Sequence, residues 1–169
     1  MSQLKVNSIV PVGGLPSGAT GGGIIQTVQT IKNDSFSTTS SSYVDITGFS
    51  VTITPSSNLS KILIMSTCGI SADGTSDVHH MNLVRGSTNI AQPASTTTFG
   101  STATNYLQTT DAMDTWSFNF IDSPSTTSAT TYKWQLKTNL GTVRINNREH
   151  SSSADMARVG TIIAMEITG

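Results

Sequence analysis

Apolar and polar side chains alternate along much of this 169-residue chain, most clearly in two segments that a polar connector joins. Every second residue of an extended strand points to the same face, so this alternation predicts strands with one apolar and one solvated face. The connector, residues 122–130, holds Pro124 in a run of Ser and Thr that is typical of a turn. We expect an antiparallel hairpin, covered by a second sheet, with Lys133 and Lys137 exposed. Its predicted core face consists of Trp116, Phe118, Phe120, Tyr132, Trp134 and Leu136.

Similar patterns predict further short strands before and after this hairpin. Phe49, Val51 and Ile53 alternate with Ser and Thr, and residues 24–31, 78–85, 142–146 and 158–168 also favour strands. Residues 62–70 are apolar on both faces, which predicts a strand at the centre of a sheet or in a subunit contact. With about eight to ten strands and no amphipathic helix, the chain is predicted to be all-β, an antiparallel β-sandwich of jelly-roll or related topology spanning residues 24–169.

The first 23 residues differ from the rest and predict an extended arm followed by a pliable tether. Leu4, Val6, Ile9 and Val10 are too few to form a core, and Pro11, Pro16 and several glycines oppose regular structure. The segment between Lys5 and Lys32 carries no charge, so we expect the arm to dock on another chain through those four apolar residues. A disordered terminus is the alternative.

Composition narrows the classes of partner. Nearly a third of the residues are Ser or Thr, 11% are charged and the net charge is −1, so we expect no nucleic-acid partner. No stretch has the roughly 20 apolar residues of a membrane-spanning helix, and the N-terminus lacks the pattern of a signal peptide. The single Cys68 rules out an internal disulfide and is compatible with assembly in a reducing cytoplasm.

We find no residue pattern that predicts catalysis, a metal site or a cofactor. The ten carboxylates fall mostly at predicted turns and strand ends, and nothing in their spacing selects the facing pair that a glycosidase needs. His79 and His80 would point to opposite faces of one strand, and Cys68 belongs to no Cys-x-x-Cys pattern. The glycines of residues 13–23 are followed by no Gly-Lys-Ser/Thr, so they do not form a phosphate-binding loop.

Two parts of the chain resemble a known family. The opening Met-Ser-Gln-Leu-Lys-Val-Asn-Ser-Ile-Val of residues 1–10 resembles the N-terminal segment of virion fibre and appendage proteins of tailed phages, especially marine and cyanobacterial ones. Residues 120–132, the strand after them and residues 160–167 are similar to small trimeric β-sandwich knobs in such proteins. The family includes tail fibres, adsorption knobs and head decorations.

The resemblance implies a non-enzymatic virion protein, assembled in the host cytoplasm. It would be a homotrimer whose arm inserts into other virion proteins, with an outward knob exposed for host adsorption. A capsid decoration or cement protein is the alternative within the family. A carbohydrate-binding, lectin-like module is the alternative outside it, because exposed Tyr or Trp on a jelly roll can stack on a host surface glycan. An enzyme is the third class.

Overall fold

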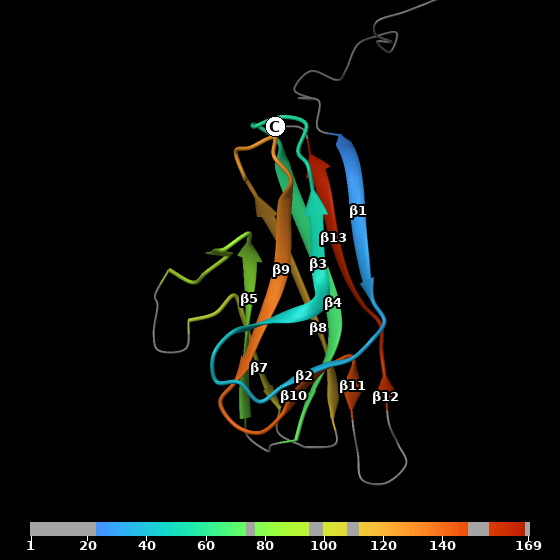
Figure 1. Ribbon diagram of the computed structural model, residues 1–169, viewed down its shortest axis with the longest axis vertical. Coiled ribbons are helices and arrows are strands. Elements are labelled where there is room, and N and C mark those ends of the chain that lie inside the picture. The colour runs from blue at the N-terminus through green and yellow to red at the C-terminus, as the bar shows by residue number, and fades with distance from the viewer. Residues whose placement is uncertain (1–22, 74–76, 95–99, 108–111, 149–155, 168–169) are drawn as a thin grey trace, which may run out of the picture.

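A computed structural model describes residues 23–73, 77–94, 100–107, 112–148 and 156–167. These residues form β-strands joined by turns and contain no helix, in agreement with the all-β prediction (Figure 1). The strands are β1 (Ile24–Lys32), β2 (Phe36–Thr38), β3 (Val44–Ile53), β4 (Lys61–Ala72), β5 (Asp77–Arg85), β6 (Thr88–Ile90), β7 (Ala103–Leu107), β8 (Met113–Asp122), β9 (Thr130–Thr138), β10 (Val143–Ile145), β11 (Asn147–Arg148), β12 (Met156–Ala157) and β13 (Gly160–Ile167).

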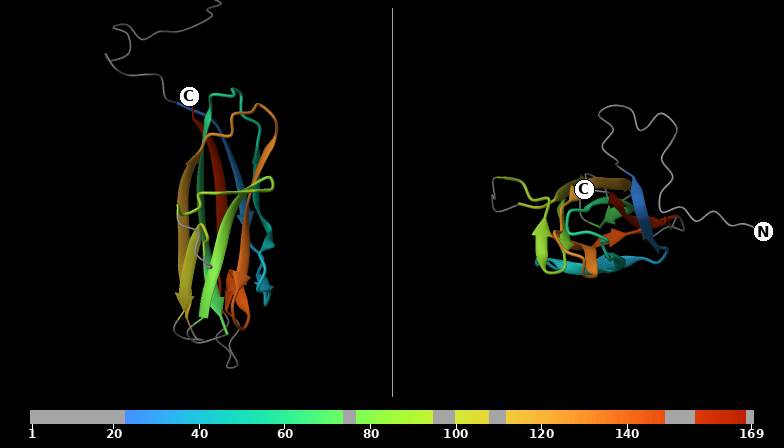
Figure 2. Two further views of the ribbon diagram at one scale, coloured as in Figure 1. Left: turned by 90° about the vertical axis from the view of Figure 1, so that its left-hand side faces the viewer. Right: turned by 90° about the horizontal axis from the view of Figure 1, so that it is seen from above.

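Two antiparallel sheets face each other across one core (Figure 2). In sheet A the order is β1-β13-β4-β8, and β10 and β2 extend it beside the C-terminal end of β4. In sheet B the order is β3-β9-β5, and β6 and β7 both pair with β5. Among the strands of five or more residues, only β5 and β7 follow one another in the same sheet. The others alternate between the two sheets, which is the winding of a jelly roll. The predicted sandwich and its jelly-roll-like topology are therefore confirmed.

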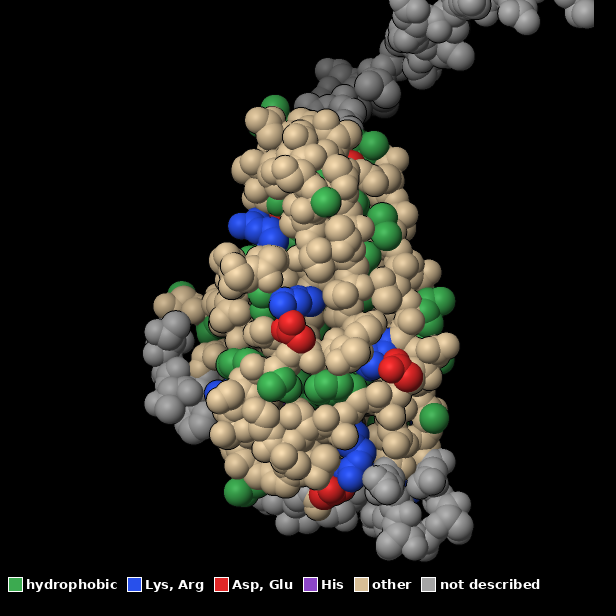
Figure 3. Space-filling model, viewed as in Figure 1, with side chains coloured by type: hydrophobic (Ala, Val, Ile, Leu, Met, Phe, Trp, Pro, Cys, Tyr) green, Lys and Arg blue, Asp and Glu red, His purple; other side chains and the backbone are tan. Residues whose placement is uncertain are grey.

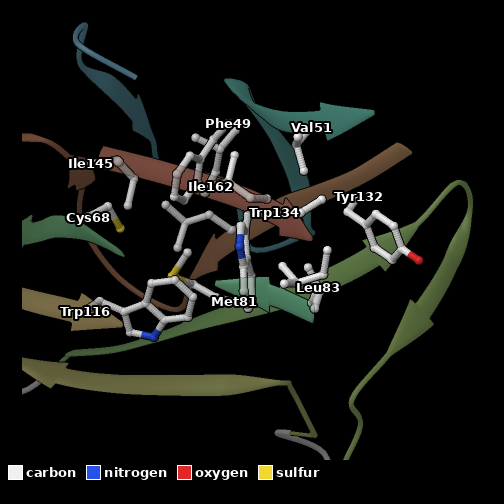
Figure 4. Packing of buried hydrophobic residues seen from close by; sticks show 14 of the residues in the cluster. Phe49, Val51, Cys68, Met81, Leu83, Trp116, Tyr132, Trp134, Ile145 and Ile162 are labelled. Carbon is white, nitrogen blue, oxygen red and sulfur yellow. The ribbon is translucent and has the colours of Figure 1, made fainter. Parts of the chain in front are cut away.

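The predicted hairpin is wrong, because β8 and β9 lie in different sheets. β8 pairs with β4, whereas β9 pairs with β3 and β5, so residues 123–129 cross from one sheet to the other. Trp116 and Trp134 therefore meet across the core, edge to face, with ring centroids 4.4 Å apart (Figure 4). Alternation predicts which side chains of a strand point inward. It does not distinguish a hairpin from a crossover between sheets, because both arrangements bury the same residues.

The predicted faces of these two strands are correct. Tyr132, Trp134 and Leu136 are fully buried and Trp116 is 7% exposed, and the indole Nε1 of Trp134 donates a hydrogen bond to Ser66 Oγ (2.9 Å). Phe118 and Phe120 point the same way but are only half-buried, because β8 pairs with β4 alone and lies at an edge of sheet A. The predicted exposure of Lys133 and Lys137 is corrected to half-buried.

β4 lies at the centre of sheet A, as its apolar sequence predicts, but only one of its faces is fully covered. Ile62, Ile64 and Ile70 point into the core and are fully buried. On the opposite face Leu63 is half-buried and Met65 is 37% exposed. The apolar run therefore belongs to a central strand whose outer side chains still contact solvent.

The predicted arm lies outside the described residues, and so do its docking residues Leu4, Val6, Ile9 and Val10. The described chain begins at Gly23 and enters sheet A directly as β1. β1 is antiparallel to β13, so the start of β1 lies beside the end of β13 at one end of the sandwich (Figure 1). The described chain therefore begins at the edge of sheet A.

Candidate functional site

The outer face of sheet A is the most unusual surface of the described residues. Strand register aligns three rows of outward side chains across β1, β13, β4 and β8. The rows are Thr27-Met165-Leu63-Ile121, Gln29-Ile163-Met65-Asn119 and Ile31-Thr161-Thr67-Ser117. We define the apolar patch as Ile31, Leu63, Met65, Ile121, Ile163 and Met165.

The apolar patch is exposed and carries no charge. Ile31 is 57% exposed and Ile121 is 53% exposed, whereas Leu63, Ile163 and Met165 are half-buried by their neighbours in the sheet. None of the twelve residues in the three rows is Asp, Glu, Lys or Arg. The exposed area of the patch is on the order of 500 Å², within the range of the largest apolar patch on a typical monomer, which is often functional.

The middle of this face is hollowed. Thr67, Ser117 and Thr161 carry small side chains in one row, next to the larger Met65 and Ile163. The hollow that they line has a volume of about 250 Å³. The outer face of sheet A therefore combines projecting apolar side chains with a recess of small hydroxyl residues.

The outer face of sheet B is polar. Lys133 Nζ forms an ion pair with Asp45 Oδ2 (2.6 Å), and Gln135 Nε2 donates a hydrogen bond to Asp45 Oδ1 (2.8 Å). These bonds hold the pKa of Asp45 below its ordinary value, with the Lys133 bond as the larger cause. The Lys137 ammonium lies 4.8 Å from the centre of the Tyr43 ring. Figure 3 looks onto this face and shows cationic side chains beside carboxylates.

The chain also covers part of sheet B with its own loop. Asn82 and Val84, on the outward side of β5, are almost fully buried. Gln92 and Thr102 lie beside them, and Thr102 N donates a hydrogen bond to Asn82 Oδ1 (3.2 Å). Gln92 and Thr102, in the segments that follow β6, thus lie over Asn82 on the outward side of β5, whereas no described segment covers the patch on sheet A.

A second hollow, of about 360 Å³, lies between the β5–β6 turn and the β8–β9 connection. Arg85, Pro124 and the hydroxyl residues Thr126 and Ser128 are among its lining residues. Arg85 Nη1 donates to both oxygens of Asp122 (2.9 and 2.8 Å), so the charge of the guanidinium is balanced by a carboxylate.

The same carboxylate anchors a buried tyrosine. The hydroxyl of Tyr132 donates a hydrogen bond to Asp122 Oδ2 (2.7 Å). Burial, and next the carboxylate of Asp122, raise the pKa of Tyr132, so its hydroxyl stays protonated. This cluster fixes the connection between β8 and β9 where it crosses between the sheets, and it offers no group poised for proton transfer.

Glu166 is the only fully buried carboxylate of the described residues, and it has a structural role. Its oxygens accept hydrogen bonds from Gln26 Nε2 (2.6 Å), from the backbone N and Oγ of Ser56 (2.7 and 2.6 Å) and from Ser60 Oγ (2.7 Å). Burial alone would raise the pKa of Glu166, but these bonds outweigh it and hold the pKa at about 2. The carboxylate fastens β13 to β1 and to the β3–β4 turn.

Other candidate chemical groups are buried as well. Burial raises the pKa of the Cys68 thiol to about 12, which disfavours the thiolate that a nucleophile needs. His79 and His80 point to opposite faces of β5, as predicted, and both are buried. Among the described residues, no group of three or more His, Cys, Asp or Glu side chains could hold a metal ion. The described residues also contain no helix of the length and apolarity that crossing a membrane requires.

The structure places the sequence-predicted residues and the candidate surface in different parts of the molecule. The six residues of the predicted hairpin form core rather than surface, apart from the half-buried Phe118 and Phe120. The apolar patch was not predicted as a surface, although Leu63 and Met65 belong to the run that is apolar on both faces. That run was the sequence signal for an exposed apolar face, because its prediction included a subunit contact as well as a sheet centre.

Comparisons with known proteins found little. No family model matches the chain, and no curated protein matches it. Two solved structures of infectious bursal disease virus are similar to it, both at 14% sequence identity. The structure of the Gx strain has a TM-score of 0.45 and covers 87% of this chain and 40% of that chain. The structure of the Gt strain has a TM-score of 0.43 and covers 85% of this chain and 38% of that chain. This chain thus spans about two fifths of the length of those proteins, and likenesses this weak carry no argument about function.

Proposed function

We propose that this chain is a non-enzymatic structural protein of a virion. Its sandwich would form a trimeric knob, exposed for host adsorption, and its N-terminal residues would anchor the knob to other proteins of the particle. Assembly would take place in the host cytoplasm. A capsid decoration or cement protein is the closest variant of this proposal, with the same parts in another position on the particle.

One observation carries the proposal: an uncharged apolar patch is left open on sheet A, while sheet B is polar and partly covered by its own loop. Contiguous exposed apolar surface of this extent is often an interaction site. A component of an assembly has partners that cover such a surface. The jelly-roll winding is also used by capsid proteins, although a fold does not define a function.

Further support comes from what the described residues do with their reactive groups. Cys68 and Glu166 are buried in structural surroundings, and Asp122 is bonded to Arg85 and Tyr132. A catalytic site needs titratable groups that face a substrate-accessible cleft. These groups instead stabilise the sandwich, as is expected of a protein whose task is assembly.

The proposed anchor can be tested with particles assembled in the presence of variant chains. Deletion of residues 1–12 should leave a folded knob that no longer joins the particle. A matched full-length variant replaces Leu4, Val6, Ile9 and Val10 with Ser, which keeps the length but removes the apolar side chains. Both variants should be absent from purified particles, as measured by quantitative mass spectrometry. Normal occupancy of either variant would contradict the anchoring role.

A second candidate function, sugar binding, is favoured by the hollow beside Arg85. A charge-balanced guanidinium surrounded by Thr and Ser hydroxyls suits a neutral polyhydroxyl ligand such as a host surface glycan. Binding of wild type to a glycan panel, lost in Thr126→Val but retained after deletion of residues 1–12, would favour this function. Equal binding by wild type and Thr126→Val would exclude the hollow as the sugar site.

A further inference from the structure

We infer that the outer face of sheet A is the surface through which copies of this chain associate, with the apolar patch of one copy against that of another. This inference rests on the proposed function, because it names the partner that covers the patch in an assembly part. The partner is a second copy of this chain.

The charge of the face favours self-association. A surface with charges of one sign meets like charges when it associates with its own copy, and like charges in an interface oppose binding. The three rows of outward residues contain no charged side chain, so two copies meet without this penalty. The nearest described charges lie in the rows just beyond the patch: Lys61, opposite Ile167, on one side, and Arg158, which lies against Gly69 and donates a hydrogen bond to Thr115 Oγ1, on the other.

The shape of the face is self-complementary. Symmetric association requires that one patch carry both the projections and the recesses that fit each other. Ile121 and Ile31 project from β8 and β1 at the two sides of the patch. The hollow of about 250 Å³ at Thr67, Ser117 and Thr161 lies between those strands and can receive such a side chain from another copy.

The extent of the face suits a sheet rather than a single segment. Four strands spaced about 4.8 Å apart make a face roughly 19 Å wide. One extended segment, such as the residues before Gly23, would cover only a strip of it. A second sheet packed at about 10 Å would cover all four strands. The apolar area, on the order of 500 Å² per copy, forms the centre of a standard interface of roughly 800 Å² per partner once the polar rim of Thr27, Gln29 and Asn119 is added.

The number of copies in the assembly can be determined from its mass in solution. Three chains of 17.8 kDa give about 53 kDa, which is the mass of the homotrimer that the resemblance implies. Face-to-face packing of two patches alone gives a pair of about 36 kDa, whereas around a three-fold axis each patch would contact parts of both neighbours. A mass of two copies would also support the face but would contradict the trimer.

The test compares charge substitutions on the two outer faces of the full-length protein. Met65→Lys places a cation at the centre of the patch, where an outward side chain that is 37% exposed allows the single chain to fold. Thr52→Lys is the matched control, because Thr52 is an exposed outward residue of β3, an edge strand of sheet B. By sedimentation at micromolar concentration we expect wild type and Thr52→Lys to be oligomeric and Met65→Lys to be at least tenfold weaker in association. Circular dichroism and a thermal melt identify any variant that fails to fold.

Cysteine cross-linking gives a second readout that does not depend on weakening the interface. Asn119→Cys on the patch rim should cross-link between copies under mild oxidation or with a short bis-maleimide, whereas Thr52→Cys should not. The native Cys68 does not interfere, because it is buried. Oxidised Asn119→Cys that remains a single chain at micromolar concentration would count against the inference.

The outcomes separate this inference from the proposed function. Wild type that is monomeric at micromolar concentration, or Met65→Lys that keeps the wild-type mass, would overturn the face as the contact. The variant with Ser at positions 4, 6, 9 and 10 should keep the wild-type mass. If that variant becomes monomeric while Met65→Lys does not, the N-terminal segments hold the copies together and the inference is wrong. Incorporation into particles is a separate measurement, and its loss in Met65→Lys is not required.

Discussion

The two outer faces of this sandwich lie on opposite sides of one core, yet they meet solvent in different ways. On sheet B the ion pair of Lys133 and Asp45 and the ammonium of Lys137 over Tyr43 present polar groups, and a loop of the same chain covers β5. On sheet A the outward residues include Met65, Ile121 and four other apolar side chains without any covering segment among the described residues. A sheet whose outer face is charged and polar is stable in water by itself. An exposed apolar sheet face is stabilised when another surface covers it, because apolar area is then removed from water.

This difference assigns separate tasks to the two faces. Burying apolar area contributes roughly 25 cal/mol per Å², so covering roughly 500 Å² stabilises the assembly by about 12 kcal/mol before the costs of association are subtracted. Surface ion pairs such as Lys133–Asp45 contribute at most about 1 kcal/mol. Sheet A is therefore the face that can drive assembly, and sheet B is the face that can remain in solvent.

The largest expected effect concerns the core that both faces share. Trp134 projects from sheet B, packs edge to face against Trp116 of sheet A and is fully buried. Trp134→Ala should lower the free energy of unfolding by about 3–5 kcal/mol, as for other large core truncations. Denaturant unfolding followed by circular dichroism measures the change. A loss below about 1 kcal/mol would mean that the two sheets do not depend on one core.

The next effect concerns Glu166, which projects from β13 of sheet A into the sandwich. Glu166→Gln keeps the shape but replaces an ionised acceptor of four donors, and should cost about 1–3 kcal/mol at neutral pH. The folded pKa of about 2 is below the ordinary value of 4.5, so the carboxylate stabilises the fold above pH 4.5 and this contribution is lost as the pH falls toward 2. The stability gap between wild type and Glu166→Gln should therefore narrow between pH 4.5 and 2. A gap that stays constant over this range would contradict the depressed pKa.

A smaller effect on the free energy of unfolding is expected for the ion pair on the outer face of sheet B. Asp45→Asn removes the ion pair with Lys133, and because the pair is half in solvent it should cost about 0.2–1 kcal/mol. The cost should shrink further in 1 M salt, where the screening length is about 3 Å. Thermal melts at low and high salt measure both. A loss of several kcal/mol would show that sheet B depends on its charges far more than a solvent-facing sheet should.

The smallest effect on folding is expected for the open side of sheet A. Ile31→Thr replaces an apolar residue that is 57% exposed with another β-branched residue, so the stability of the single chain should change by less than about 0.5 kcal/mol. Association of copies should nevertheless weaken measurably in sedimentation. Asp45→Asn, on the outer face of sheet B, should leave association unchanged. Equal effects of the two on association would remove the distinction between the faces.

Several features of the fold can be predicted from the local sequence alone. Phe49, Val51 and Ile53 alternate with polar residues and are buried as expected, and the β5–β6 turn falls at Gly86-Ser87, where Gly86 has a φ of 59°. The inward face of β9 is also as predicted, with Trp134 fully buried. These features depend on neighbouring residues only, because alternation and turn chemistry are local properties.

Other features of the fold are defined only by contacts between residues far apart in the sequence. β7 lies in a Ser/Thr-rich segment whose pattern predicts no strand, and its pairing with β5 defines it. Glu166 alternates into the core as an apolar residue would, and only the convergence of Gln26, Ser56 and Ser60 makes a buried carboxylate tolerable there. The polar donors come from residues far away in the chain, which no local pattern contains.

The order of apolar and polar residues along the chain was enough to predict the all-β class and the inward faces of most strands, whereas for residues 62–70 it left both a sheet centre and a subunit contact open. The tertiary structure alone decided that β8 and β9 pair in different sheets and that Leu63, Met65, Ile121 and Ile163 share one open face. Alternation states that a side chain points to one side of its strand, but which strand lies beside it, and whether another layer covers that side, is set by long-range packing of the whole chain.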